Sequence, residues 1–262
     1  MKLNIIDVVK HNRQTLASVE SFVSKDDYNN SPDNYGLPQH VKHLIDLEID
    51  DDLTYIDFIN FLSQYFITKN IKYVEIGVSV LKTFYQAASF LENSELYAFD
   101  INEINPTIEK KFSKKKSSGR FNNYALGTNN ISYFQGDVFN PDDLESFKNK
   151  VGNNANIIFS DAFHTSLGLA SEYIRYIQGS LDNEFILYYD DLEGPAMQGV
   201  FMDIARDIYR TNPNTHAAFV MMNGWLGQHE HKHTNGIITS LDLPKIFSEN
   251  RLNIQGQSVE LQ

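Results

Sequence analysis

The stretch KYVEIGVSVLKTF, residues 72–84, decides the fold. A run of strand character ends at Gly77, and a segment with helical spacing of its apolar residues begins a few positions later. A glycine at such a turn lets the backbone approach another group closely, and the helix that follows points its N-terminus toward whatever binds there. The stretch therefore predicts the first strand, turn and helix of an α/β fold.

The same alternation continues along the chain. Strands are predicted at residues 72–77, 95–100, 131–137, 156–161 and 185–191, each followed by a helical stretch. Strand, helix and strand repeated at this spacing are typical of a doubly wound, mostly parallel Rossmann-like sheet with helices on both faces. Ligands of such sheets bind beyond the carboxyl ends of the strands, where the strand order reverses.

The two ends of the chain depart from this pattern. Apolar segments at 216–226 and 235–243, separated by a polar turn, predict an antiparallel hairpin at the sheet edge and a sheet of seven strands. Upstream, two segments of helical periodicity flank a loop. We therefore predict an N-terminal helical extension, residues 1–69, and a Rossmann-like domain, residues 70–262. The extension could form a lid, with the loop segment SPDNYGLPQH (31–40) closing over a ligand, or a dimer surface.

Composition excludes several classes of function. The chain of 262 residues carries a net charge of -12, which opposes binding to nucleic acids or anionic membranes. It has no cysteine, which excludes disulfides, thiolate nucleophiles and cysteine-based zinc sites. No segment has the pattern of a signal peptide or the length of a membrane span, so we expect a cytoplasmic protein with a small-molecule partner. A homo-oligomer is left open.

Acidic residues mark the predicted ligand-binding edge of the sheet. Four of the five predicted parallel strands end in acid: Asp100, Asp137, Asp161 and the pair Asp190 and Asp191. One such aspartate often caps the next helix, but a row of them at one edge indicates a binding site.

The first turn and the second strand fit a nucleoside cofactor. Asp100 follows Gly77 by 23 residues, which is the usual place for a carboxylate that binds both ribose hydroxyls. Leu81 stands near the position where a further glycine is expected, so no phosphate cradle is visible. A cofactor without a pyrophosphate fits better than a dinucleotide.

At this point the sequence resembles a known family. The segments VEIGVSVLKTF, LYAFDIN, ISYFQGDVF, NIIFSDAFHTSLG and FILYYDDLEGP, in this order, are similar to the class I S-adenosylmethionine-dependent methyltransferases, over roughly residues 70–240. The spacing of Asp161 and His164 and the Asp190–Asp191 pair most resemble metal-dependent O-methyltransferases, such as catechol O-methyltransferase and the macrolide and aminocoumarin sugar O-methyltransferases. The resemblance implies methyl transfer from S-adenosylmethionine to a hydroxyl of a small molecule, with a sugar or polyol of secondary metabolism as one acceptor class.

The resemblance also implies roles for the first three strand ends. Glu75 and Asp100 would hold the methionine and ribose parts of the cofactor, with Gly77 and Ser79 in the turn that lies against it. Asp137 would lie near the adenine.

Asp161, Asp190 and Asp191 are the predicted cation ligands. Neighbouring strands run about 4.8 Å apart, so acids at the ends of 156–161 and 185–191 can converge. Asp191 faces the other side of an ideal strand, but a turn at Glu193–Pro195 can swing it back. Three carboxylates suit Mg²⁺, with Mn²⁺ or Ca²⁺ as alternatives. Asp161 is also expected to contact the cofactor and to take part in the reaction.

His164 is the candidate general base. It follows Asp161 by three residues at the start of the next helix, and its ordinary pKa suits neutral pH. Some sugar O-methyltransferases carry a histidine at this offset. The alternative is a histidine that caps or packs locally.

Three other features of the sequence are expected not to form a binding or catalytic site. His229, His231 and His233 would share one face of a strand and could bind Zn²⁺ or Fe²⁺, but a solvated loop is favoured. Trp225 is expected in the core rather than as a stacking platform. A basic cluster is expected to be a solvated helix end and loop rather than a phosphate clamp: Lys110, Lys111, Lys114, Lys115, Lys116 and Arg120.

Two other functions remain open. One is a metal-free N-methyltransferase whose aspartates bind a cationic amine. The other is a non-catalytic binding domain or an enzyme that uses another nucleotide.

Overall fold

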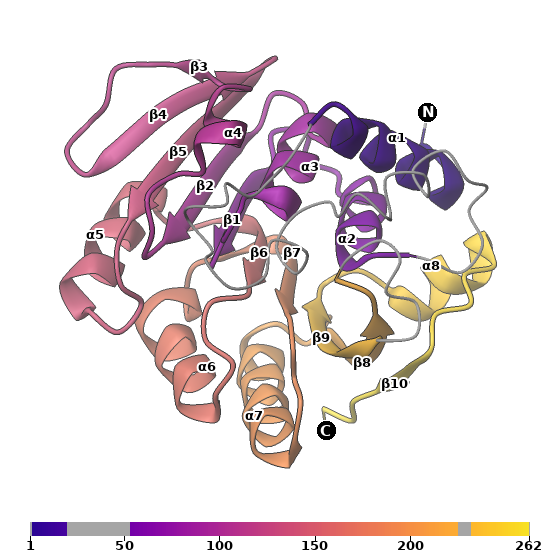
Figure 1. Ribbon diagram of the computed structural model, residues 1–262. Helices are drawn as coiled ribbons and strands as arrows, with labels where there is room; N and C mark the ends of the chain where they lie inside the picture. The colour runs from indigo at the N-terminus through magenta and orange to yellow at the C-terminus, as the bar shows by residue number, and fades with distance from the viewer. Residues whose placement is uncertain (1, 20–52, 225–231, 262) are drawn as a thin grey trace.

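The computed structural model describes residues 2–19, 53–224 and 232–261 (Figure 1). The predicted lid segment 31–40, together with Trp225, His229 and His231, lies outside the described residues. None of the helices in the described ranges is both long and apolar enough to cross a membrane.

A single sheet organises the described chain. Its strand order is β10-β8-β9-β7-β6-β1-β2-β5-β4-β3. The central strands are parallel: β5 (Asn129–Gln135), β2 (Glu95–Asp100), β1 (Lys72–Ile76), β6 (Ala155–Ser160) and β7 (Leu181–Tyr189). The chain runs outward from β1 to β5 and then returns to the other side of β1 with β6, so the strand order reverses between β1 and β6. This confirms the doubly wound fold and places its crevice at the ends of β1 and β6.

Over the described residues the sheet has ten strands, so the expected number of seven is wrong. The additional strands are β3 (Ser113–Lys114), β4 (Phe121–Leu126) and β10 (Gly256–Ser258). The helical stretch expected after β2 is reduced to the four residues of α4 (Pro106–Glu109), and β4 pairs antiparallel with β5. β4 escaped the hydrophobic pattern because polar Asn122 and Asn123 interrupt it, and a strand near the edge of a sheet needs few buried side chains.

The predicted hairpin consists of β8 (His216–Met222) and β9 (His233–Thr239), which pair antiparallel as expected. The second arm, β9, lies beside β7 and therefore separates β7 from β8. β10 then pairs on the outer side of β8. The start of β9 is thereby brought to the end of β7.

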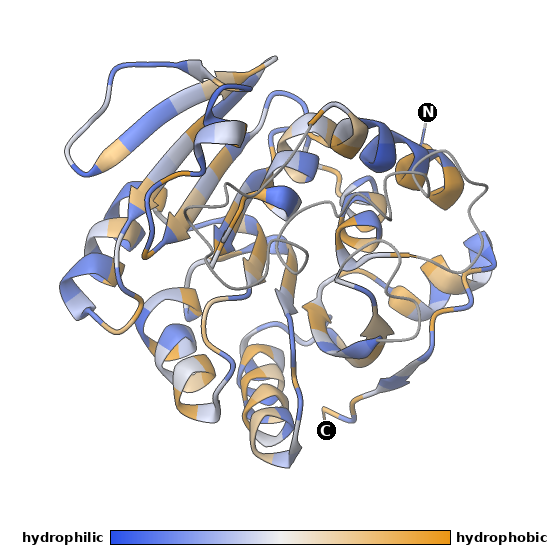
Figure 2. Cartoon of the chain, viewed as in Figure 1, coloured by the Kyte–Doolittle hydropathy of each residue, from blue (hydrophilic) through white to orange (hydrophobic). Residues whose placement is uncertain are grey.

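Helices cover both faces of the sheet (Figure 1). One face packs against α1 (Ile5–Ala17), α2 (Tyr55–Ser63), α3 (Lys82–Phe90) and α8 (Leu243–Asn250). The other packs against α5 (Pro141–Val151), α6 (Ser166–Glu172), the π-helical turn at Tyr173–Ile177 and α7 (Pro195–Thr211). Figure 2 shows apolar residues along the central strands and polar residues on the outer parts of α5 and β4.

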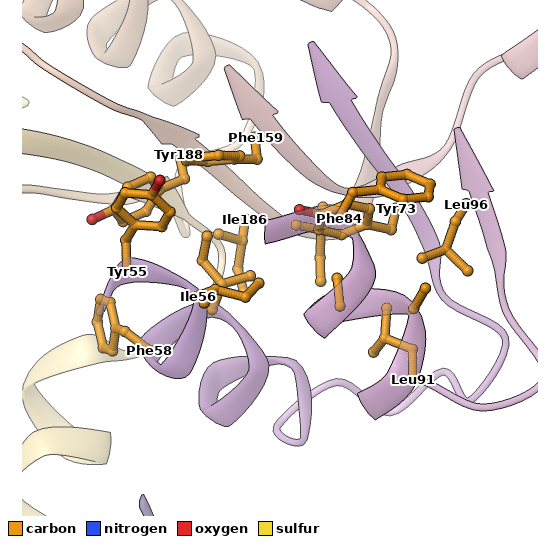
Figure 3. Packing of buried hydrophobic residues seen from close by; sticks show 14 of the residues in the cluster. Tyr55, Ile56, Phe58, Tyr73, Phe84, Leu91, Leu96, Phe159, Ile186 and Tyr188 are labelled. Carbon is orange, nitrogen blue, oxygen red and sulfur yellow. The ribbon is translucent and has the colours of Figure 1, made fainter. Parts of the chain in front are cut away.

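The buried apolar residues between the sheet and α1, α2, α3 and α8, here called the first hydrophobic cluster, join α2 to the end of the sheet that carries the crevice. Figure 3 shows Tyr55 of α2 beside Phe159 of β6 and Tyr188 of β7. The ring centroids lie 5.0 Å and 6.1 Å from that of Tyr55. Burial of such aromatic surface contributes about 25 cal/mol per Å² and fixes α2 over the ends of these strands.

Buried polar contacts attach α1 to α2. Thr54 and Asp57 form a capping box that starts α2. Asp57 also accepts a hydrogen bond of 2.7 Å from Asn12 of α1, and Asn60 donates to Asn12 at 3.0 Å. Burial raises the pKa of Asp57, and the hydrogen bonds from Thr54 and Asn12 partly offset this increase. The division of the chain at residue 70 remains a prediction.

Candidate active site

Asp161 and Asp190 come from neighbouring strands that end in register. Ser160, the last residue of β6, pairs with Tyr189, the last residue of β7. The amide of Asp190 donates to the carbonyl of Ser160 at 3.0 Å, so the two aspartates leave the sheet side by side. Each lies two residues after a side chain of the first hydrophobic cluster, Phe159 or Tyr188, and alternation places both on the face covered by α2.

Asp191 reverses direction through its own backbone. Its φ is 50°, a left-handed conformation that aspartate tolerates better than most residues. Its carboxylate oxygens lie 3.6 Å from Nδ1 of His164 and 3.2 Å from Nε2 of His233. The adjacent aspartates therefore converge, although an ideal strand would point them to opposite faces.

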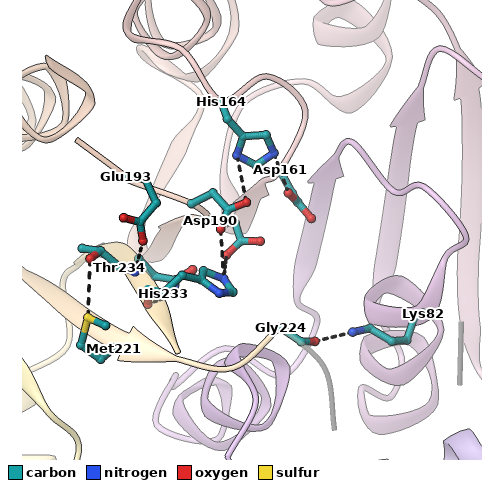
Figure 4. Close-up of polar contacts among 11 residues, drawn as sticks. Lys82, Asp161, His164, Asp190, Glu193, Met221, Gly224, His233 and Thr234 are labelled. Atoms are coloured by element: carbon teal, nitrogen blue, oxygen red, sulfur yellow. Dashed lines mark hydrogen bonds and ion pairs between the residues drawn. The ribbon is translucent and has the colours of Figure 1, made fainter. Parts of the chain in front are cut away.

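His164 lies between two of the predicted cation ligands, Asp161 and Asp191, and Figure 4 shows its contact with Asp161. Its Nε2 is 3.3 Å from Oδ1 of Asp161, and its Nδ1 faces Asp191. The contact with Asp161 is the main reason why the pKa of His164 is raised. Burial and the negative charge of Asp190 raise the pKa of Asp161 to about 7.

His233 joins the site although the sequence favoured a solvated loop for it. It is the first residue of β9, and its Nε2 lies 2.8 Å from Oδ1 of Asp190 (Figure 4). One ligand atom each from Asp190, Asp191 and His233 lie within 4.8 Å of one another. In the described part of the chain, Asp161 is not a member of this group of three residues. It is connected to the group through its contact with His164. The alternate spacing of the histidines was the available signal, but the partner of His233 depends on sheet order.

The first turn has a left-handed backbone at its glycine and also at two residues that are not glycine. Gly77, Ser79 and Leu81 have φ values of 86°, 45° and 64°. A Cβ at position 77 would overlap the backbone of Asp161, so this glycine is required by the approach of β6. Leu81 is fully buried, and its side chain belongs to the first hydrophobic cluster.

Asp100 and Ser79, both predicted to bind the cofactor, are in contact. The buried carboxylate of Asp100 accepts hydrogen bonds of 2.8 Å from the amides of Ser79 and Asn102. Ser79 and Asn102 also line a cavity of about 570 Å³, which is in the size range of small-ligand sites. The cavity continues along the segment after β2 and the ends of β4 and β5, with Glu103, Asn122 and Gln135 among its walls.

Glu75 and Asp137 lie on either side of this region. Glu75 is buried, its pKa is raised by that burial, and Tyr73 donates to it at 2.6 Å. Asp137 caps its own loop, since its side chain accepts from the amide of Phe139 at 2.9 Å. Its amide donates to Asp143, which also pairs with Arg120 of the basic cluster.

Lys82 was not singled out from the sequence. It lies in the first turn of α3, is 6% exposed, and donates through Nζ to the carbonyl of Gly224 (Figure 4). Burial lowers its pKa to about 7, although the charges of Asp190 and Asp161 act in the opposite direction. A lysine at a helix start is ordinarily solvated, but here Nζ lies 5.7 Å from the ring centroid of Tyr55 in α2 and contacts Gly224, which follows β8.

No protein-family model and no curated protein sequence matches the chain. Among solved structures, the chain is similar to an O-methyltransferase from Bacillus cereus in complex with SAH, at 14% identity and a TM-score of 0.48, covering 73% of this chain and 83% of that one. It is also similar to the O-methyltransferase TomG from Streptomyces achromogenes in complex with SAM, at 10% identity and a TM-score of 0.48, covering 77% and 86%. A third is the MycE methyltransferase in complex with Mg, SAH and mycinamycin VI, at 13% identity and a TM-score of 0.38, covering 71% and 48%. Spermidine synthases also resemble the chain. The site's own residues therefore carry the functional assignment.

The acidic residues at the ends of β6 and β7 have the donor chemistry of a divalent cation site. Carboxylate oxygens are the ligands that Mg²⁺, Mn²⁺ and Ca²⁺ prefer. The raised pKa values of Asp161 and Asp191 reflect burial and the repulsion of nearby carboxylates, which a cation would remove.

Two aromatic side chains lie at the edge of the sheet where the parallel strands end. Phe139, after β5, and Phe163, after β6, pack edge to face with ring centroids 4.5 Å apart. They are 43% and 45% exposed, which is unusual for phenylalanine. They give this polar edge a flat apolar surface.

Proposed function

We propose that this chain is an S-adenosylmethionine-dependent O-methyltransferase that acts on a hydroxyl group of a small molecule and uses a divalent cation bound by Asp161, Asp190 and Asp191. The observation that carries the proposal is the convergence of these carboxylates with His164 at the edge of the sheet where the strand order reverses. A sugar or another natural product is the acceptor class that we favour.

The surroundings of Asp100 support the nucleoside part of the cofactor. A carboxylate at the end of the second parallel strand is placed to accept from ribose hydroxyls. Both of its oxygens accept from backbone amides, and each oxygen retains a lone pair for a further donor. The adjacent cavity would supply space for the nucleoside, and the exposed Phe139–Phe163 pair would supply an apolar surface at the same edge of the sheet.

The negative charge of the site supports a cationic methyl donor. S-adenosylmethionine, when bound, supplies a sulfonium methyl group whose transfer to the acceptor oxygen leaves a neutral thioether. Glu75 and Asp161 would lie on the methionine side and favour the positive charge.

The acceptor would meet the carboxylates and His164. A bound cation supplies Lewis acidity, which lowers the pKa of a hydroxyl that it contacts. His164 is placed to take the hydroxyl proton, and its side chain is 40% exposed toward solvent. The hydrogen bond to Asp161 and the charges of Asp161 and Asp191 raise the pKa of His164, and a cation that neutralised these carboxylates would lower it toward that of a working base.

We also propose that residues 1–69 cover the acceptor. Tyr55, at the start of α2, donates its amide to the carbonyl of Asn223 at 3.0 Å, next to the end of β8. The ring of Tyr55 packs against the ring of Tyr188, which precedes Asp190 by two residues in the sequence. The extension is therefore attached beside the proposed site.

A second candidate keeps the cofactor and omits the cation. In this case the carboxylates would bind a cationic amine acceptor, and the protein would be an N-methyltransferase. The acids at the site are compatible with both candidates. The sensitivity of ligand binding and activity to metal removal distinguishes them.

Thermal unfolding with S-adenosylhomocysteine, in Mg²⁺ and EDTA arms, tests the proposal. A ligand at a hundred times its Kd adds about 2.7 kcal/mol, which predicts a rise in Tm of roughly 5 to 10 °C for a chain of this size. Asp100→Asn should lose most of this rise, and Asp190→Asn should lose its dependence on metal. Asp203→Asn, on the exposed side of α7, is the matched control. A rise that ignores metal favours the N-methyltransferase, and no rise contradicts both candidates.

A further inference from the structure

We propose that His233 is a direct ligand of the cation, so that the site has a mixed nitrogen and oxygen donor set and prefers a first-row transition ion such as Mn²⁺ to Mg²⁺. This inference rests on the cation of the proposed function and deepens it. It concerns a residue that belongs to a different strand from the three aspartates.

The distances fit adjacent corners of one coordination sphere. In an octahedral site with metal–ligand bonds of about 2.1 Å, neighbouring donors lie about 3.0 Å apart. Nε2 of His233 lies 2.8 Å from Oδ1 of Asp190 and 3.2 Å from Oδ1 of Asp191. One ligand atom from each of the three residues lies within 4.8 Å of the others, so a single ion can contact all three.

A simple histidine–aspartate pair explains these contacts less well. One ring nitrogen faces two carboxylates, and a single N–H can be directed at only one of them. The Asp190 side chain is 7% exposed and the His233 side chain 21% exposed, so water screens this contact weakly, whereas the Asp191 side chain is 42% exposed. A divalent cation satisfies the nitrogen lone pair and both carboxylates together.

The fold holds His233 in place through its neighbour in β9. The amide of Leu192 donates to the carbonyl of Thr234 at 2.7 Å, and the amide of Thr234 donates to Glu193 at 3.0 Å (Figure 4). These bonds join the start of β9 to the segment that follows Asp191. The imidazole is thus pre-organised beside the carboxylates, which is what a ligand position requires.

The nitrogen donor sets the metal preference. Mg²⁺ and Ca²⁺ favour sites made of oxygen ligands, whereas imidazole suits the first-row transition ions. Mn²⁺ accepts carboxylates and imidazole together and is the weakest binder of that series. We therefore expect the site to prefer Mn²⁺ to Mg²⁺.

Mn²⁺ binding to the full chain, followed by electron paramagnetic resonance without any methyl donor, tests the inference. We expect tighter binding of Mn²⁺ than of Mg²⁺ by at least about 10-fold, and spin-echo modulation from imidazole nitrogen. His233→Ala should weaken Mn²⁺ binding at least about 10-fold and remove the modulation. His216→Ala, in the adjacent strand β8, is the matched control and should change neither.

Further variants keep the test decisive. If His233→Ala does not fold, His233→Gln retains a polar side chain and should flatten the preference between Mn²⁺ and Mg²⁺. Modulation that persists in the His233 variants and disappears in His164→Ala would assign the nitrogen to His164 and overturn the inference. Failure of the wild type to bind Mn²⁺ would also overturn it. Mn²⁺ binding through His233 with no response to S-adenosylhomocysteine would uphold this inference and contradict the proposed function.

Discussion

The backbone of Gly77 packs directly against the backbone of Asp161. The amide of Asp161 donates to the carbonyl of Ile76 at 2.8 Å. A Cβ at position 77 would lie 2.6 Å from Cα of Ala162 and would overlap the carbonyl group of Asp161. The position of Asp161 in the proposed site therefore depends on the absence of a side chain in the first turn.

Gly77→Ala should destabilise the protein by about 3 to 5 kcal/mol, because it combines a left-handed backbone with overlap of backbone atoms. Gly179→Ala is the matched control: Gly179 has a φ of 76°, but a Cβ added there would have no atom within 4 Å, so about 1 kcal/mol is expected. Urea unfolding measures both. Equal losses in the two variants would show that strain, not the approach of β6, determines the need for Gly77.

Ser79 and Leu81 should respond oppositely to glycine. Both have positive φ, so glycine relieves strain at either position. Ser79→Gly should stabilise the protein by roughly 0.5 to 1 kcal/mol. Leu81→Gly should destabilise it by about 2 to 4 kcal/mol, because Leu81 is fully buried and the lost packing outweighs the relief. Denaturant unfolding of the two variants gives the comparison, and stabilisation by both would contradict the packing role of Leu81.

The parallel core and the convergence of Asp161 with Asp190 could be predicted because both depend on local pattern. Apolar runs end in acids, and neighbouring parallel strands bring such ends together. The contact of His233 could not be predicted in the same way, since it requires β9 to lie between β7 and β8. The pairing of β4 with β5 likewise depends on tertiary contacts, which the asparagines of β4 do not predict.

Lys82 shows a further limit of local pattern, because its burial arises from elements distant in sequence. Its pKa falls to about 7 in the folded chain from 10.5, so between these values the unfolded chain binds more protons and the free energy of unfolding rises with pH. Lys82→Met removes this term. The variant should gain most relative to wild type at pH 7 and least near pH 10, as measured by denaturant unfolding. Lys245→Met, on an exposed part of α8, is the control and should show no such trend.

Glu172 is a buried acid on the other face of the sheet, and its stability effect should have the opposite pH dependence. Its Oε1 has no hydrogen-bond partner among the described residues, and burial raises its pKa to about 7 from 4.5. Between these values the folded chain binds more protons than the unfolded chain, so the free energy of unfolding falls as the pH rises.

Glu172→Gln should therefore stabilise the protein by on the order of 1 to 3 kcal/mol at pH 8 and by little at pH 5. The amide is neutral at both values, and the buried hydroxyls of Tyr176 and Tyr189, which have no hydrogen-bond partner within the part of the chain that the structure describes, offer acceptors near it. Thermal unfolding at the two pH values measures the effect, with Glu145→Gln on the exposed face of α5 as the control. A gain that is the same at pH 5 and pH 8 would show that charge burial at Glu172 is not its cause.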